Sequence, residues 1–574
     1  MKQYMYKKTK ELFRFVVYIL LPLVGGGGVG VSCSDMLETS SNLVEFEKDN
    51  TLDHATDSVY SVMGIVYKLQ SIADRTVLLG EARGDLMTPT SAASADLKRL
   101  SAFDFSQDNK YNQVSDYYAV INNCNYFLAH VDTAMQRRGR NLFLREYAVV
   151  KSYRAWTYLQ LAINYGNVPF VTEPLMTEVE ARKAMNGPRT GIVDICNYLI
   201  NDLTPYVGVE LPEYSTHNSM NPKDFFLPMR AVIGDLCLWA GRYQEAAYWY
   251  HDYLTDERDP IKLNSFCSRW SNATEFLTPN TGYSVTNNDE VLSYIPMESR
   301  VFDGVVSDLP NVYNSTDENY RYFQLMPSRA IRNLSAAQTY CFEVKSDIRT
   351  DTLFAPKEGL LDDIYAGDLR LCSNYSLSSQ GKDEYSEYND ERQTIKKLWN
   401  NRVPVYRRTM VYLRYAEALN RAGFPQSAMC VLKYGMCEEN IEEYVDSTEQ
   451  KKAGELITFN RTFFPYNNAI GIHSFGSGDS QANPYFALPM PEAALPTYED
   501  TVRYQIPLVE DIIVNEMALE GAFEGNRYHD LLRIALRRND PAYLADPVSR
   551  RNGEVDESVR TLLMDTKNWF LPLP

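Results

Sequence analysis

The sequence of 574 residues predicts a mainly α-helical fold of paired helices that carries a large loop-rich insertion. Apolar residues recur at helical spacing over several long stretches, which is typical of helices that bury one face. Short turns join these stretches in pairs. Between residues 259 and 401 the periodicity fades, and Ser, Asn, Asp, Thr and aromatic residues dominate. An irregular stretch of this length is usually functional or disordered, and its aromatic content argues against disorder.

The composition is that of an acidic globular protein. Hydrophobic residues make up 45% of the chain and charged residues 23%, and the formal net charge is −18. This charge argues against a nucleic-acid partner, which requires a basic surface, and against electrostatic docking of the chain on anionic lipid. The 41 tyrosines are compatible with wet binding surfaces, because each ring offers an apolar face with a hydroxyl at its rim.

Residues 1–32 have the organisation of an export signal, with a basic front, an apolar middle and a run of glycines. Cys33 follows small residues at the end of this segment, an arrangement that resembles a lipobox. The resemblance implies that Cys33 becomes the lipid-modified first residue of the mature chain and that residues 33–52 form its tether. The alternative is ordinary cleavage nearby, with Cys33 incidental. No later segment has the ~18 uninterrupted apolar residues of a membrane-spanning helix.

The N-terminal helical-pair region is expected to cover residues 53–258. Helices are predicted at Asp53–Leu69, Ser115–Val131, Thr190–Leu203 and Asp224–Ala240. Residues 88–110 have the composition of a loop, Gln136–Arg140 is a candidate turn, and Gly241 separates the fourth helix from another. Helices paired by short turns are the unit of tetratricopeptide-type repeats, although a strict period of ~34 residues is absent.

A long helix is predicted to begin at Leu144 and to end before Pro169. Its buried stripe is formed by Leu144, Ala148, Ser152, Ala155, Leu159 and Ala162. Gly166 tolerates left-handed geometry and Pro169 cannot continue the helix, so the chain is expected to leave the bundle here. Lys151 and Arg154 lie beside the stripe and are expected to pair with carboxylates of a neighbouring helix, such as those of the last helical block.

The insertion at residues 259–401 contains one predicted strand, Glu290–Pro296. The helical pattern returns in a C-terminal helical-pair region, residues 402–574. Helices are predicted there at Tyr406–Ala422, at Gln426–Met436 and within Ile506–Arg537, with a second polar insertion at about 440–505.

Three carboxylates of the last block, Glu516, Glu520 and Glu524, are spaced to share one helix face. Because neighbouring like charges repel, they need cations, and Arg527 and Arg533 are the nearest candidates. One interpretation is a glycosidase carboxylate pair, and the favoured one is a salt-bridge network that holds the helix to the bundle.

The sequence predicts no catalytic residue, metal site or cofactor. Its cysteines and histidines show no CxxC, HxxxH or HExxH spacing, and no GxSxG, P-loop or GxGxxG motif occurs. Cys124, Cys196 and Cys237 lie in helical apolar runs and are interpreted as small buried side chains.

Several segments together resemble the SusD/RagB family of outer-membrane nutrient-binding lipoproteins. The segments are RAWTYLQLAINYGNVPFVTEPL after Tyr153, RYAEALNRAG after Leu413, GAFEGNRYHDLLRIA after Glu520, and a helix with Tyr118, Ile121 and Asn125 in register. The resemblance implies a tetratricopeptide-like helical-pair superhelix whose large insertion forms the ligand face. It also implies a lipid-anchored, surface-exposed location at the outer membrane and a SusC-like TonB-dependent transporter as partner, with binding and hand-over rather than covalent chemistry.

The favoured ligand is an oligosaccharide. The alternatives are a peptide, which some members of the family take, and a helical-repeat adaptor for another protein; an enzyme is the least favoured. The resemblance places Gly84-Asp85, and with it Arg75, near the ligand face. Candidate ligand-binding residues are the loop aromatics and their polar neighbours: Trp270, Tyr283, Tyr313, Asn314, Tyr320, Arg321, Tyr322, Arg75 and Asp85.

Overall fold

The first helix of the computed structural model, α2 (Ala55–Arg83), is longer than the sequence predicts. The structure describes residues 55–573, except 107, 216–220, 264–268, 271–278, 281–289, 299–303, 315–322, 346–349, 355–365, 380–390 and 398–401. Residues 52–574 form one compact unit. The prediction that α2 ends at Leu69 is wrong, because Leu78, Leu79 and Ala82 continue its buried face.

Helix α4 (Val114–His130) confirms the predicted second helix and packs against α2. The predicted loop before it contains β1 (Met87–Pro89) and α3 (Ala95–Ser101), whose N-terminus is capped by Ser94. The predicted turn is a β-hairpin of β2 (Gln136–Arg137) and β3 (Arg140–Asn141).

Helix α5 (Leu144–Tyr165) confirms the predicted long helix. It ends at Gly166, whose φ of 71° lies in the left-handed region. The prediction of a single buried stripe is wrong, because nearly every residue from Glu146 onward is buried. Lys151 and Arg154 both pair with Asp202 at the end of α7 (Ile192–Leu203), not with the last helical block. Two charged residues can therefore lie inside the bundle because one carboxylate serves both.

The second helical pair packs α7 against α8 (Met229–Ala240), and α8 against α9 (Tyr243–Leu254). Helix α8 begins five residues later than predicted, after Pro228. The connection from α5 contains α6 (Glu178–Met185) and a short pair of strands, β4 (Val168–Pro169) and β5 (Arg189–Thr190).

The 259–401 insertion contains more strands than the one predicted. That strand is confirmed as β8 (Val291–Pro296), and it pairs antiparallel with β14 (Arg402–Arg407), a segment partly assigned to a helix from the sequence. The other elements are β6 (Arg269–Trp270), β7 (Pro279–Asn280), α10 (Leu309–Tyr313), β9 (Leu325–Pro327), α11 (Arg329–Ala337), β10 (Cys341–Lys345), β11 (Thr350–Phe354), α12 (Arg370–Asn374), β12 (Tyr375–Ser379) and β13 (Glu391–Ile395). Among the described residues the sheets are two-stranded and antiparallel.

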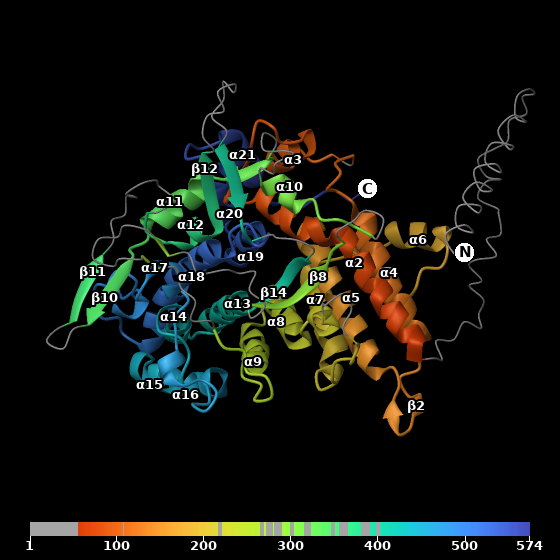
Figure 1. Cartoon of the computed structure of the whole chain (residues 1–574), viewed down its shortest axis with the longest axis horizontal. Helices are drawn as coiled ribbons and strands as arrows, with labels where there is room; N and C mark the ends of the chain where they lie inside the picture. Colours follow the sequence, from red (N-terminus) through yellow and green to blue (C-terminus); the bar gives the residue numbers. More distant parts are fainter. Residues whose placement is uncertain are drawn as a thin grey trace, which may run out of the picture. The chain divides into compact units, whose positions relative to one another are not determined.

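The C-terminal region returns to helices. They are α13 (Arg408–Arg421), α14 (Pro425–Lys433), α15 (Glu438–Tyr444), α16 (Ser447–Ala453), α17 (Ser474–Ser477), α18 (Tyr498–Gly521), α19 (Arg527–Arg538), α20 (Ala542–Ser549) and α21 (Glu557–Leu563). Short 3-10 turns lie at Thr204–Tyr206, Pro222–Phe225, Gly454–Ile457, Tyr466–Asn468, Ser480–Ala482 and Thr566–Trp569. Figure 1 shows α13, α14, α18 and α19 side by side, in agreement with their contacts.

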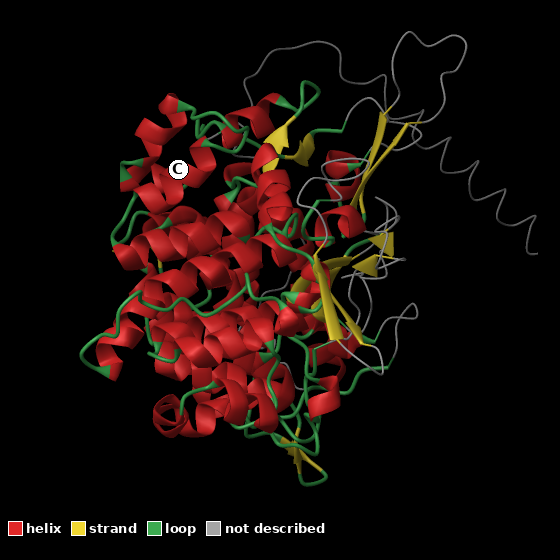
Figure 2. Ribbon diagram, turned by 90° about the vertical axis from the view of Figure 1, so that its left-hand side faces the viewer, coloured by secondary structure: helices red, strands yellow, loops and turns green. Residues whose placement is uncertain are grey.

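The helices gather on one side of the body, and most strands lie on the other (Figure 2). One continuous apolar core extends from α2 to the C-terminal segment. None of the helices in the described part of the chain combines the length and apolarity that a membrane crossing requires. The predicted region boundaries stay predictions.

Candidate functional site

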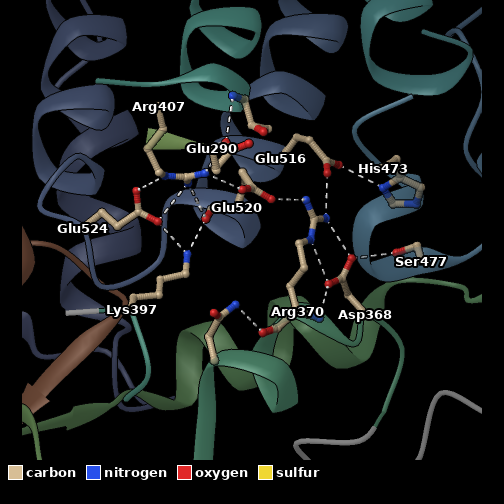
Figure 3. A network of polar contacts seen from close by, with 12 residues as sticks. Glu290, Asp368, Arg370, Lys397, Arg407, His473, Ser477, Glu516, Glu520 and Glu524 are labelled. Carbon is tan, nitrogen blue, oxygen red and sulfur yellow. Dashed lines mark hydrogen bonds and ion pairs between the residues drawn. The ribbon is translucent and has the colours of Figure 1, made fainter. Parts of the chain in front are cut away.

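The three carboxylates of the last block lie in a buried ionic network (Figure 3). Glu516 and Glu520 lie on α18, and Glu524 follows it. The Arg370 guanidinium contacts Glu516 Oε1 at 2.6 Å and Glu520 Oε2 at 3.3 Å. The Arg407 guanidinium contacts Glu520 Oε1 at 3.0 Å and Glu524 Oε2 at 2.7 Å. The interpretation of these carboxylates as a salt-bridge network is therefore confirmed.

The cations of this network differ from those predicted. Arg527 instead pairs with Asp85, and Arg533 pairs with Glu417 and Asp530. Arg370 and Arg407 come from α12 and β14, segments more than a hundred residues earlier in the chain. Further members are Lys397, Glu290, Asp368, His473 and Ser477.

Burial alone would raise the pKa of each carboxyl in the network, but the guanidinium groups outweigh it at several of them. Although burial acts in the opposite direction, the pKa values of Asp368 and Glu516 are lowered, chiefly by Arg370. The pKa of Glu524 is lowered in the same way by Arg407 and Lys397. At Glu290 burial outweighs Arg407, and the pKa is raised. These groups join α18 to the insertion and lie beneath the surface.

Two predicted ligand-face residues lie inside the protein. Arg75 is 7% exposed and pairs with Asp116 at 2.5 Å. Asp85 is 4% exposed and receives two hydrogen bonds from the Arg527 guanidinium, at 2.7 and 3.0 Å. Arg75 lies within α2 rather than in a loop, and Asp85 follows the end of that helix. Each is engaged in an ion pair with another element, so neither offers a free side chain to a ligand.

Tyr313 and Asn314 also make contacts within the protein. Tyr313 ends α10 and is fully buried, so its interpretation as a loop aromatic is wrong. The Asn314 side chain donates to the Ile395 carbonyl oxygen at 3.4 Å and accepts from the Ile395 N–H at 2.6 Å. It thereby fixes the end of β13.

The remaining predicted site residues are not tested by the structure. Trp270 lies in β6, which pairs with β7, but its side chain is outside the described set. Tyr283, Tyr320, Arg321, Tyr322 and Cys33 lie outside the described residues.

An open polar cleft occurs in the second insertion, which the sequence had not singled out for binding. Its volume is about 860 Å³. Lining residues include Lys262, Glu343, Arg408, Tyr444, Asn467, Asn468, Asp479 and Gln481. We call it the insertion cleft. By contrast, the internal cavity between α5, α8, β14 and α19 measures only about 90 Å³, which is too small for a sugar ring.

One aromatic ring, Tyr444, and the amides of Asn467 and Asn468 line the insertion cleft, and Tyr466 directly precedes the two asparagines. Tyr444 stacks in parallel on Tyr434, with ring centroids 3.6 Å apart, and is 37% exposed. Tyr466 is 48% exposed and begins the turn that carries Asn467 and Asn468. Both asparagine side chains are exposed, and neither forms a side-chain hydrogen bond within the described residues.

Hydrogen bonds hold several polar side chains of the cleft lining in place. Arg408 donates from Nη1 to the Lys262 carbonyl oxygen at 3.2 Å, while its buried Nε has no partner within the described residues. Gln481 donates to the Tyr434 carbonyl oxygen at 3.2 Å, and the Asp479 carboxylate accepts from the Glu343 N–H at 2.8 Å. Rings beside amides and fixed polar groups suit a ligand with apolar faces and many hydroxyls. Among the described residues no cluster of side chains could hold a metal ion.

No protein-family model and no curated protein matches the chain. Solved structures do match it. A SusD-like carbohydrate-binding protein from Bacteroides fragilis is 15% identical and gives a TM-score of 0.54 over 85% of this chain and 88% of its own. A SusD superfamily protein from Bacteroides vulgatus is 14% identical, with a TM-score of 0.52 over 88% of this chain and 94% of its own.

A third match, a SusD superfamily protein from Bacteroides thetaiotaomicron, is 14% identical and gives a TM-score of 0.52 over 84% of this chain and 89% of its own. The chain has the SusD-like fold. The mainly α-helical fold class predicted from the sequence is thereby confirmed. Within the SusD-like fold of this chain, the ionic network joins scaffold elements and the insertion cleft is the candidate binding surface.

Proposed function

We propose that this chain is a member of the SusD/RagB family that binds an oligosaccharide at the cell surface and delivers it to a SusC-like TonB-dependent outer-membrane transporter. The observation that carries the proposal is the SusD-like fold over most of the chain. One of the proteins that share this fold is a carbohydrate-binding protein.

The chemistry of the insertion cleft supports an oligosaccharide. A sugar presents apolar C–H faces and hydroxyls, which match the exposed ring of Tyr444 and the exposed amides of Asn467 and Asn468 that line the cleft. The volume of about 860 Å³ accommodates a short oligosaccharide. Anchoring at the outer membrane and transfer to a transporter are supported by the sequence of residues 1–33 and by the resemblance.

Binding to a glycan array and titration calorimetry test the proposal. The mature chain should show saturable binding to at least one oligosaccharide. Tyr444→Ala should weaken that binding at least tenfold, because it removes a stacking face worth about 1.4 kcal/mol or more. Trp270→Ala and Tyr320→Ala test the loop aromatics predicted from the sequence.

Tyr248→Ala is the matched control, since Tyr248 is 47% exposed on α9 and lies outside the insertion cleft. The affinity of Tyr248→Ala for the oligosaccharide should equal that of the wild type. Binding to peptides with silence on every glycan would show that the oligosaccharide assignment is wrong. Equal affinities of the wild type and Tyr444→Ala would remove the insertion cleft from the binding site.

A further inference from the structure

The hairpin of β2 and β3 places exposed arginines on an otherwise acidic protein. Arg137, Arg138 and Arg140 are all exposed, while the chain carries a net charge of −18. The hairpin projects beyond the ends of the neighbouring helices (Figure 1, β2). None of these three arginines has an ion-pair partner within the described residues.

Two features of these arginines destabilise the hairpin. Arg138 and Gly139 have φ values of 54° and 76°, which is the pattern of a type I′ turn. Asn, Asp or Gly is favoured at the first of these positions, and an arginine there costs backbone energy. Arg137 and Arg140 are direct cross-strand partners, and like charges at such positions repel. Neither choice strengthens the hairpin.

A hollow of about 1350 Å³ lies beside the hairpin. The hairpin forms one wall, and Gly208, Val209, Glu210 and Glu213 belong to the other. Three further charged residues, Arg145, Glu210 and Glu213, line the hollow, and Arg145 is already neutralised because it pairs with Glu210 and lies 3.6 Å from Glu213. The arginines of the hairpin thus remain the available cations of the hollow among its lining residues.

We propose that the hairpin and this hollow form a second binding site, for an acidic glycan that bears carboxylate or sulfate groups. Guanidinium groups bind such oxyanions through paired hydrogen bonds. An oxyanion held between Arg137 and Arg140 would turn their cross-strand repulsion into attraction for the ligand. The choice of a glycan among polyanions rests on the function proposed above, and the concave hollow favours a chain ligand over a flat membrane.

The probes are dextran sulfate and uncharged dextran, which share a backbone and differ in charge. The mature chain, purified in a neutral detergent, is titrated with each at low and physiological salt. We expect it to bind dextran sulfate, with affinity that falls as salt rises, and not to bind dextran. The triple variant Arg137→Gln, Arg138→Asn, Arg140→Gln should weaken binding at least tenfold. Asn at position 138 keeps the geometry of the turn.

The control variant Arg99→Gln, Arg182→Gln, Arg503→Gln removes the same charge from exposed positions elsewhere and should retain wild-type affinity within twofold. Equal losses in both triple variants, or no binding of dextran sulfate by the wild type, would overturn the proposal. So would hairpin-dependent binding to phosphatidylglycerol vesicles without binding to dextran sulfate. The hairpin variant should still bind a neutral oligosaccharide, because that binding depends on the insertion cleft. Such binding distinguishes failure of the hairpin proposal from failure of the proposed function.

Discussion

At the scale of single residues, Glu81 is a carboxyl group enclosed where α2 meets the segment after α18. It is fully buried, and its Oε1 accepts a hydrogen bond from the Gly525 N–H at 2.8 Å. Its Oε2 has no partner within the described residues. Burial raises the pKa of Glu81 to about 8, with Glu524 and Asp85 acting in the same direction and Lys397 against it.

Glu81→Gln should therefore change the pH dependence of stability. Between the ordinary pKa of 4.5 and about 8 the folded protein keeps the Glu81 proton, whereas the unfolded chain has lost it. The wild type then loses about 1.4 kcal/mol per pH unit at this site as the pH rises through that window. The melting temperature of Glu81→Gln relative to the wild type should rise steadily from pH 5 to pH 8. The exposed Glu492→Gln is the control, and a constant difference for Glu81→Gln would contradict the prediction.

Arg370→Met should destabilise the protein strongly. It removes the cation shared by Asp368, Glu516 and Glu520 and leaves buried carboxylates without compensation, at a cost of about 3–5 kcal/mol. Burial raises the pKa of Asp368 and Glu516, and Arg370 reverses this in the wild type. Without Arg370 these carboxyls should take up protons as the pH falls below neutral, which removes the uncompensated charge. Urea unfolding at pH 7 and pH 4 should show a smaller difference from the wild type at pH 4. Arg503→Met, in an exposed pair, should cost less than about 0.5 kcal/mol.

At the scale of elements, α2 approaches the segment after α18 at Gly80. A Cβ atom on Gly80 would lie 1.7 Å from the Gly525 carbonyl oxygen. Gly64, on the same helix, has nothing within 4 Å of such an atom. A comparison of substitutions at Gly80 and Gly64 therefore distinguishes the effect of close packing from the effect of helix propensity.

Gly80→Ala should destabilise the protein by more than about 2 kcal/mol, because two backbones would have to move apart. Gly64→Ala should stabilise it by roughly 0.5–1 kcal/mol, since alanine is the better helix former and meets no neighbour. Thermal unfolding of both variants checks the pair. A stabilised Gly80→Ala would show that α2 and the segment after α18 are not in close contact.

The helical pairs could be predicted from the sequence because their apolar spacing is a local signal, as in α4, α5 and α13. The second half of α2 could not, since Arg75, Glu81 and Arg83 interrupt its pattern and are accommodated only by distant partners. Arg75 pairs with Asp116 and Arg83 donates to Asn164.

No local sequence pattern predicts the insertion cleft either. It combines Lys262, Glu343, Arg408 and Tyr444 with Asn467 and Asn468, and these come from five separate segments. Pairing of β8, inside the 259–401 insertion, with β14, directly after it, joins segments that lie more than a hundred residues apart in the chain. A Tyr-Asn-Asn turn in a polar insertion was the available sequence clue, and alone it does not distinguish a binding surface from an ordinary exposed turn.

At the scale of the whole molecule, the two candidate binding surfaces lie on different parts of the body. The insertion cleft includes the end of α15, and the basic hairpin follows α4 (Figure 1). Mutations at one surface should therefore leave binding at the other unchanged.

Cys33→Ala should release the protein from the membrane without unfolding it. If Cys33 carries the lipid, the wild type should incorporate labelled palmitate, enter the detergent phase of a Triton X-114 separation and be cleaved by trypsin added to intact cells. Cys33→Ala should lose the label and move to the aqueous phase, because a lipid anchor supplies about 0.8 kcal/mol per buried methylene group. Its circular dichroism should match that of the wild type, since residues 52–574 form a compact unit of their own. Ser40→Ala, within the tether, is the control and should behave as the wild type. Label retained by Cys33→Ala would show that the anchor is elsewhere.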